Sequence, residues 1–291
     1  MMNENALKER LKVIAAEKAV PMNKIWKQLL LERFLARLSV SRHQTQFIFK
    51  GGLLLANYIA IHRETTDLDF LLTKLKAEAK NIEKAISEIA IADINDGFHF
   101  TWDSIKELNQ PHMEYTGFRI VLNSKFGNMS DKIQIDIGVG DAVAPVETVF
   151  FPFEYKGKPI FTGEISLQVY PPESIFSEKL HSIVSRGVVN SRMKDYHDLV
   201  LMIREPKLLD HKKLSGAIQT TFKQRGDAIK LPIQFEKENM SSLQQYWTNH
   251  LRGLGGFRNR LNFSDQLREV IAEINHFMDV IPVSFKNEIK Q

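Results

Sequence analysis

The stretch FIFKGGLLLANYIAIHRETTDLDFLL, residues 47–72, decides the fold of this chain. It opens with a short β-prone run at residues 47–50, which ends at two consecutive glycines. Residues 53–61 have the apolar composition of a buried helix, and residues 67–72 alternate as a strand does. The stretch therefore predicts a strand, a helix that follows the glycine pair, and a second strand.

The glycine pair, Gly51 and Gly52, stands where the main chain could approach a bound anion. Two residues without side chains let a ligand come close to the backbone, and the start of a helix offers unpaired N–H groups to negative charge. A lone glycine pair is more often only a turn. The residues that follow it decide between these interpretations.

Asp67 and Asp69 lie two residues apart in the second predicted strand, so both carboxylates project from one face. Two neighbouring carboxylates repel each other, and Mg²⁺ is the natural ion to sit between ligands that are all oxygens. A lone pair with this spacing is more often an exposed edge or an acidic cap. Asp69, however, lies between Leu68 and Phe70 in an otherwise apolar strand, where a buried carboxylate needs a partner.

A third carboxylate, Asp136, lies in the β-prone run at residues 132–138. If this strand is next to residues 67–72, Asp136 could join Asp67 and Asp69. Three carboxylates can hold two metal ions about 3.5–4 Å apart, which is the arrangement used for in-line phosphoryl or nucleotidyl transfer.

The helix predicted over residues 172–186 carries a lysine within its apolar stripe. Ile175, Phe176 and Leu180 fall at helical spacing on the same face as Lys179. Lysine is rarely fully buried without a partner. Its ammonium could hold a triphosphate as a point charge, or it could extend past the apolar side chains to solvent.

Two aspartates follow on the next predicted helix, residues 191–204. Asp195 and Asp198 are three residues apart and therefore share one side of it. One of them could pair with Lys179 or orient a nucleotide, and the sequence does not decide which. The alternative is a surface ion network with Arg192 and Lys194, which would contribute little stability.

The order of the predicted elements is typical of an α+β protein. Residues 5–40 have helical spacing interrupted at Pro21, a region of strands follows, and after about residue 166 the pattern changes to helices. We therefore predict a mixed sheet with flanking helices over residues 1–165 and a helical domain over residues 166–291. The other predicted strands are residues 98–102, 115–122, 132–138, 148–153 and 160–161, with a hairpin turn at 123–130, and the other predicted helices are residues 77–90, 172–186, 191–204, 212–225, 241–251 and 264–281.

Composition excludes several classes of site. The chain of 291 residues has 39 basic and 35 acidic residues, a formal charge of +4, and no cysteine. Without cysteine there is no disulfide framework, thiolate nucleophile, iron–sulfur cluster or cysteine-based zinc site. Residues 1–12 do not resemble a signal peptide, and no apolar run approaches the roughly 18 residues of a membrane span. We expect a cytoplasmic protein that does not enter a membrane.

Residues 252–260, RGLGGFRNR, concentrate three arginines and three glycines. This composition predicts a flexible basic loop that could contact the phosphates of a nucleic acid. A solvated loop before the last helix is the alternative.

Strand, Gly-Gly, helix and Asp-x-Asp in this order resemble the DNA polymerase beta-type nucleotidyltransferase superfamily. The fuller pattern, KGG at residues 50–52 with RxTxDxD at residues 63–69, resembles the AbiEii/AbiGii toxin family, whose relatives include the MenT toxins. A second block, EKL at residues 178–180 and RxKDxxDL at residues 192–199, is similar to later motifs of that family. The resemblance covers about residues 47–202, and roughly the last 80 residues match only loosely, chiefly at Trp247.

The resemblance implies a nucleotidyltransferase-like mixed sheet and a metal-dependent nucleotidyl transfer from NTP. The metal would be Mg²⁺ or Mn²⁺, held by Asp67, Asp69 and Asp136. The residues implied to bind the nucleotide are Lys50, Gly51, Gly52, Thr65 and Lys179, and those implied to serve catalysis are Asp67, Asp69, Lys179, Asp195 and Asp198.

The resemblance also implies a toxin of a toxin–antitoxin or phage-defence pair, with a cognate antitoxin as partner and the tRNA 3′ end as acceptor. Two other classes stay open. The enzyme could modify a protein or a small molecule, or the chain could be a non-catalytic nucleotide-binding module. Intact metal carboxylates argue against the binding module, because a degenerate site should have lost one of them.

Overall fold

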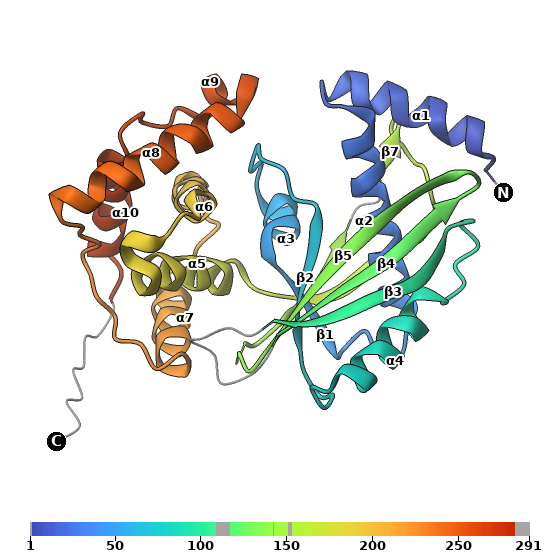
Figure 1. Cartoon of the computed structure of the whole chain (residues 1–291), viewed down its shortest axis with the longest axis horizontal. Helices are drawn as coiled ribbons and strands as arrows, with labels where there is room; N and C mark the ends of the chain where they lie inside the picture. Colours follow the sequence, from blue (N-terminus) through green and yellow to red (C-terminus); the bar gives the residue numbers. More distant parts are fainter. Residues whose placement is uncertain (1, 109–116, 142, 151–152, 283–291) are drawn as a thin grey trace. The chain divides into compact units, whose positions relative to one another are not determined.

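The computed structural model describes residues 2–108, 117–141, 143–150 and 153–282. Its elements fall into two compact units (Figure 1), which we describe one at a time. The first unit consists of Met1–Leu54, Thr65–Gly140 and Pro145–Val169, and the second of Leu55–Glu64, Asp141–Ala144 and Tyr170–Gln291. We keep residues 1–165 and 166–291 as the proposed functional domains.

A mixed sheet of seven strands forms the centre of the first unit, in the order β3-β4-β5-β2-β1-β9-β6. The pairs β2–β5 and β1–β9 are parallel, and the other pairs are antiparallel. A separate two-stranded ribbon pairs β7 with β8. The strands are β1 Phe47–Lys50, β2 Asp67–Leu72, β3 His99–Leu108, β4 Gly117–Phe126, β5 Met129–Val139, β6 Val146–Phe150, β7 Glu154–Tyr155, β8 Lys158–Pro159 and β9 Ile165–Val169.

The strands that carry the decisive stretch, β1 and β2, have the predicted bounds. The hairpin predicted at residues 123–130 is confirmed, because β4 and β5 are joined by a tight turn at Gly127 and Asn128. Gly127 has φ +58°, a conformation that glycine adopts at little cost. Parts of two predicted strands, residues 115–116 and 151–152, lie outside the described residues.

One predicted strand near the end of this unit is wrong, and one strand was missed. Residues 160–161 form no strand; Ile160 instead donates a backbone hydrogen bond to Phe153, which closes the ribbon of β7 and β8. Strand β9 was missed, although its residues ISLQV alternate between apolar and polar as a strand does. It pairs with β1 and β6, and every second side chain of β9 is buried.

Helices α1 Glu4–Glu17, α2 Met22–Val40 and α4 Ala79–Ala90 complete the first unit, and α3 Gly51–Tyr58 continues directly from β1. In α4 the residues Ile82, Ala85, Ile86 and Ile89 are buried, which is the one-sided apolar stripe of an amphipathic helix. Helix α2 packs against α4 and against the sheet at β5 and β9. One face of the sheet is thereby apolar, and the half-buried Asp67, Asp69 and Asp136 lie on the other.

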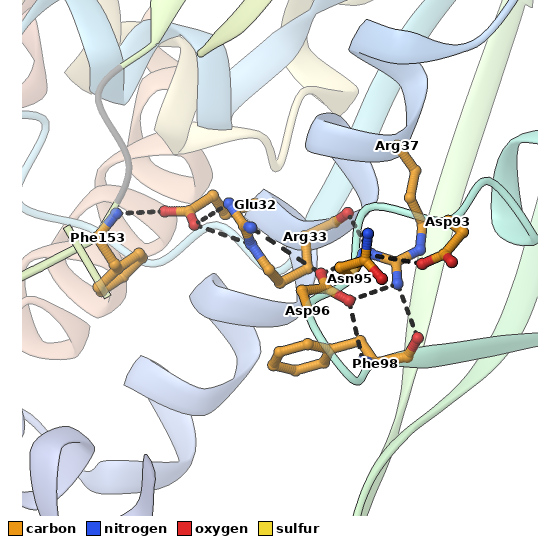
Figure 2. A network of polar contacts seen from close by, with 8 residues as sticks. All are labelled: Glu32, Arg33, Arg37, Asp93, Asn95, Asp96, Phe98 and Phe153. Atoms are coloured by element: carbon orange, nitrogen blue, oxygen red, sulfur yellow. Dashed lines mark hydrogen bonds and ion pairs between the residues drawn. The ribbon is translucent and has the colours of Figure 1, made fainter. Parts of the chain in front are cut away.

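A buried ion network ties α2 to the segment before β3 (Figure 2). Arg37 donates to both carboxylate oxygens of Asp96, at 2.8 and 2.7 Å, and to the carbonyl of Phe98 at 2.7 Å. Arg33 donates twice to Glu32, whose other oxygen accepts the backbone N–H of Phe153. Arginine is rarely buried unless it is paired. The network therefore fixes α2 against the sheet and pairs opposite charges within the apolar layer.

Helices form the second unit, as predicted. They are α5 Pro172–Arg186, α6 Met193–Arg204, α7 His211–Gln224, α8 Lys237–Gly253, α9 Arg258–Leu261 and α10 Leu267–Asp279, with short 3₁₀ turns η1 Gly187–Val189 and η2 Gly255–Phe257. Helix α5 packs on α6 and α7, and α10 packs on α6 and α8. Across the described ranges, no helix combines the length and the apolar character that crossing a membrane requires.

The prediction of a flexible loop at residues 252–260 is wrong, because this segment is mostly helical. Arg252 lies in the last turn of α8, and the segment continues through η2 into α9. Buried Leu254 and Leu261 anchor it, and Arg258 pairs with Asp265. The glycines had suggested flexibility, but Gly255, with φ +55°, serves a tight turn between helices.

Candidate active site

Three carboxylates meet on the open face of the sheet in the first unit. Strand β5 runs parallel to β2, with Asp136 directly beside Asp69 and Gln134 beside Asp67. Asp67, Asp69 and Asp136 each offer an oxygen, and these oxygens all lie within 4.8 Å of one another. The structure thus brings together the three residues that the sequence could only place on two separate strands.

The donor set suits a hard divalent cation. All three donors are carboxylate oxygens, the ligands that Mg²⁺ and Mn²⁺ prefer. Three such groups within 4.8 Å repel one another unless positive charge lies nearby. The arrangement can therefore hold a metal ion, and its donor atoms suit a hard divalent cation.

Gly51 lies directly under one of these carboxylates. A Cβ atom on Gly51 would be only 2.0 Å from Oδ2 of Asp69, and the backbone there has φ +80°. Both facts require glycine at the junction of β1 and α3. The start of α3 therefore approaches the carboxylates as closely as the backbone permits, and Gly52 lies in the first turn of that helix.

Lys50 and Thr65 flank the carboxylates along the chain. Lys50 is the antiparallel partner of Asp69, so the two side chains share a face of the sheet. Its Nζ atom lies 3.8 Å from the position of a Cβ on Gly138, so the side chain reaches across β2 to β5. Thr65 is half-buried and precedes Asp67 by two residues.

Arg119 is a residue of this site that the sequence did not reveal. From β4 it donates through Nε to Oδ1 of Asp136 at 2.9 Å and through Nη2 to Oδ2 at 2.7 Å. The hydrogen bond with Asp136, and then the charges of Asp136, Asp67 and Asp69, raise the pKa of Arg119 above its ordinary value. The alternating pattern of its strand marks it as facing away from the core, but nothing local says that Asp136 is its neighbour.

A second cluster of charges lies inside the helical unit. Lys179 on α5 approaches Oδ2 of Asp198 at 2.6 Å and Oδ1 of Asp195 at 3.5 Å. Arg63 holds Asp198 in a two-pronged pair at 2.7 and 2.6 Å, and Arg192 donates to Asp195 at 2.8 Å. Both aspartates are completely buried, so this is not a surface ion network.

The ionisation of this cluster follows from its geometry. Burial alone would raise the pKa of Asp198, but the charge of Lys179 and the hydrogen bonds and charge of Arg63 hold the pKa below its ordinary value. Burial lowers the pKa of the neighbouring His197 to about 4. At neutral pH His197 is therefore uncharged; its Nε2 donates to the carbonyl of Ile61 at 2.7 Å, which leaves Nδ1 to accept from His250 at 3.0 Å.

The predicted site residues thus form two groups. Lys50, Gly51, Gly52, Thr65, Asp67, Asp69 and Asp136 lie together in the first unit, and Lys179, Asp195 and Asp198 lie together in the second. Arg63 belongs to the second group, although the sequence places it beside the Asp-x-Asp motif.

Comparison with known proteins gives matches at the level of family and fold. The profile of a family described as "Nucleotidyl transferase AbiEii toxin, Type IV TA system" matches residues 33–272. JHP933 from Helicobacter pylori has a similar structure, with a TM-score of 0.50, 13% sequence identity, and coverage of 89% of this chain and 91% of that chain. A candidate nucleotidyltransferase from H. pylori has a TM-score of 0.48 at 13% identity, covering 90% and 96%. No curated protein matches the sequence. The likeness to JHP933 shows a shared fold and confirms the predicted α+β class.

Proposed function

The chain belongs to the AbiEii family of nucleotidyltransferase toxins, and from this premise we propose that it transfers a nucleoside monophosphate from an NTP to an acceptor hydroxyl in a reaction that depends on Mg²⁺ or Mn²⁺. The observation that carries the proposal is the group of three carboxylates within 4.8 Å beside the start of α3. In this reaction the acceptor oxygen attacks the α-phosphorus and pyrophosphate leaves.

Each residue of the first unit has a role in this proposal. Asp67, Asp69 and Asp136 would hold the metal, which in such sites stabilises developing charge and lowers the pKa of an attacking hydroxyl. Backbone N–H groups at Gly51 and Gly52 would bind the phosphates, because the start of a helix favours an anion. Lys50 would add positive charge, and Thr65 would donate its hydroxyl to a phosphate oxygen.

We propose tRNA as the acceptor and an antitoxin as the protein partner. The family description names a toxin–antitoxin system, and the formal charge of +4 suits a polyanionic acceptor. Because both proposed substrates, NTP and tRNA, are found in the cytoplasm, we propose that the reaction takes place there. Transfer to a protein or a small molecule, or nucleotide binding without transfer, are the alternatives that the following experiment distinguishes.

The protein is incubated with each of the four NTPs, labelled at the α-phosphate, together with Mg²⁺ and total cellular RNA and protein. We expect label from one preferred NTP in RNA of tRNA size, removed by trimming of the 3′ end and absent when the metal is chelated. Label in a protein or a small product would replace the tRNA proposal, and bound NTP with no labelled product would leave a binding module.

For the second unit we propose that Lys179 contributes positive charge to the triphosphate. Lys179, Arg63 and Arg192 surround the two buried carboxylates of Asp195 and Asp198, so positive charge gathers around this cluster. Asp195 and Asp198 would then orient these cations. The alternative is that Lys179 only stabilises the helical unit.

Replacing Lys179 with Met should weaken NTP binding by about tenfold, which corresponds to about 1.4 kcal/mol. The fold should survive, because Asp198 keeps Arg63 and Asp195 keeps Arg192. Titration calorimetry measures the affinity, and Lys194→Met, which removes an exposed lysine from the next helix, is the matched control. Unchanged NTP affinity and turnover in Lys179→Met would assign Lys179 a structural role.

A further inference from the structure

A row of four charged residues crosses the face of the sheet that carries the carboxylates. Arg119 on β4 is the register partner of Asp136 on β5, Asp136 of Asp69 on β2, and Asp69 of Lys50 on β1. Directly paired residues project from the same face of a sheet. Two carboxylates in the middle of the row are therefore flanked by a cation on each side.

Arg119 occupies both oxygens of Asp136. Its planar fork matches the carboxylate edge, with hydrogen bonds of 2.9 and 2.7 Å, which fixes the carboxylate as well as neutralising it. Asp136 is also one of the three groups that can hold a metal. A metal ion on Asp136 and the guanidinium of Arg119 would then be neighbouring positive charges that share one carboxylate.

The pair is built so that it can open. The side chain of Arg119 is 42% exposed and that of Asp136 is 20% exposed. Because the guanidinium is partly exposed, water can take over its hydrogen bonds when it moves away from Asp136. By contrast, the Arg37–Asp96 pair of the same unit is almost fully buried and cannot exchange partners in this way.

We propose that Arg119 is the counter-ion of the metal-free site, and that a divalent metal binds in competition with it for Asp136. Arg119 neutralises Asp136 when no metal is bound, on the side of the carboxylates opposite Lys50, and it opposes the metal by its charge. It is a positioning residue that sets the metal affinity of the enzyme. This inference rests on the proposed metal site and adds the residue that regulates it.

The test measures metal affinity on the full-length protein without nucleotide, from the electron paramagnetic resonance signal of free Mn²⁺. Arg119→Met should bind Mn²⁺ about fivefold more tightly than the unsubstituted protein. A neighbouring unit charge opposes a divalent ion by about tenfold in affinity even with water-like screening, and the lost orientation of Asp136 offsets part of that gain. Arg119→Lys keeps the charge and should stay within about twofold of the unsubstituted protein. Arg42→Met, which removes an exposed arginine paired with Glu88 elsewhere in the unit, is the matched control and should change nothing.

Thermal unfolding gives a second measure that does not depend on activity. In a chelator, Arg119→Met should unfold at a lower temperature than the unsubstituted protein, because its three carboxylates have lost a counter-ion. Saturating Mn²⁺ should remove most of that difference in unfolding temperature. If the substitution had instead damaged the packing, Mn²⁺ would not restore the unfolding temperature.

Asp136→Asn distinguishes failure of the proposed metal site from failure of the proposed competition by Arg119. If Asp136→Asn weakens Mn²⁺ binding but Arg119→Met leaves it equal or weaker, the metal site stands and the competition is disproved. If neither Asp136→Asn nor Asp67→Asn changes Mn²⁺ binding, the metal site itself is wrong and the role of Arg119 is lost with it.

Discussion

Replacing Asp67 with Asn is expected to lower the rate of nucleotidyl transfer by a factor on the order of 10³. Asn keeps the shape of the side chain but loses the charge that holds the metal. A bound metal contributes several kcal/mol to the stabilisation of the transition state, and about 4 kcal/mol corresponds to that factor. Single-turnover transfer of labelled nucleotide to the acceptor measures the rate.

Two further measurements separate loss of the metal from loss of the fold. In the absence of metal, Asp67→Asn should be at least as stable as the unsubstituted protein, because one of three mutually repelling carboxylates is gone. Asp103→Asn is the matched control: Asp103 lies on β3 of the same sheet and pairs with exposed Lys132, outside the cluster. If Asp67→Asn kept near-normal turnover, the metal assignment would be wrong.

Replacing Gly51 with Ala should both destabilise the protein and disable the site. The new Cβ would lie 2.0 Å from Oδ2 of Asp69, so the carboxylate or the start of α3 must move. A displacement of about 1 Å at a reacting centre can cost about 10² in rate. The positive φ and the crowding together should cost about 2–4 kcal/mol of unfolding free energy.

Comparison with Gly157→Ala separates the destabilisation caused by the contact of the new Cβ with Asp69 from that caused by the positive φ. Gly157, in the ribbon of β7 and β8, also has positive φ, at +71°, but no atom of the described residues lies within 4 Å of its Cβ position. Denaturant unfolding should show Gly51→Ala to be less stable than Gly157→Ala by about 1–3 kcal/mol, and Gly157→Ala should keep full transfer activity. Equal destabilisation with full activity in both variants would show that the approach of Gly51 to Asp69 has no functional meaning.

Local rules were sufficient for a large part of the fold. The apolar patterns that predicted β1, β2, α4 and α5 depend on which way successive side chains point, and backbone geometry fixes that direction within a few residues. The same rules missed β9 and proposed a strand at residues 160–161. Residues 160–161 are too few to show a period, so pairing decides their conformation, whereas the alternation of β9 was present in the sequence and was overlooked.

Lys179 shows how far the partners of a buried charge can be predicted from the sequence. Its place in an apolar stripe predicted that it needs a partner, and Asp195 and Asp198 were recognised as candidates from their shared helix side. Only the packing of α5 on α6 shows that both aspartates contact it, and that Arg63 comes from far along the chain to join them. Burial turns a network that would contribute little at the surface into one that fixes the ionisation of Asp198.

The sequence by itself determined that Asp67 and Asp69 share a face, because the two-residue period of a strand is a property of the covalent chain. It also placed a glycine pair between a strand and a helix, where an anion could be bound. Only the tertiary structure decided that Asp136 lies beside Asp69 and that Arg119 lies beside Asp136. Strand order and register come from the burial of side chains far apart in the sequence, and a shift of one residue would have turned Asp136 to the apolar face.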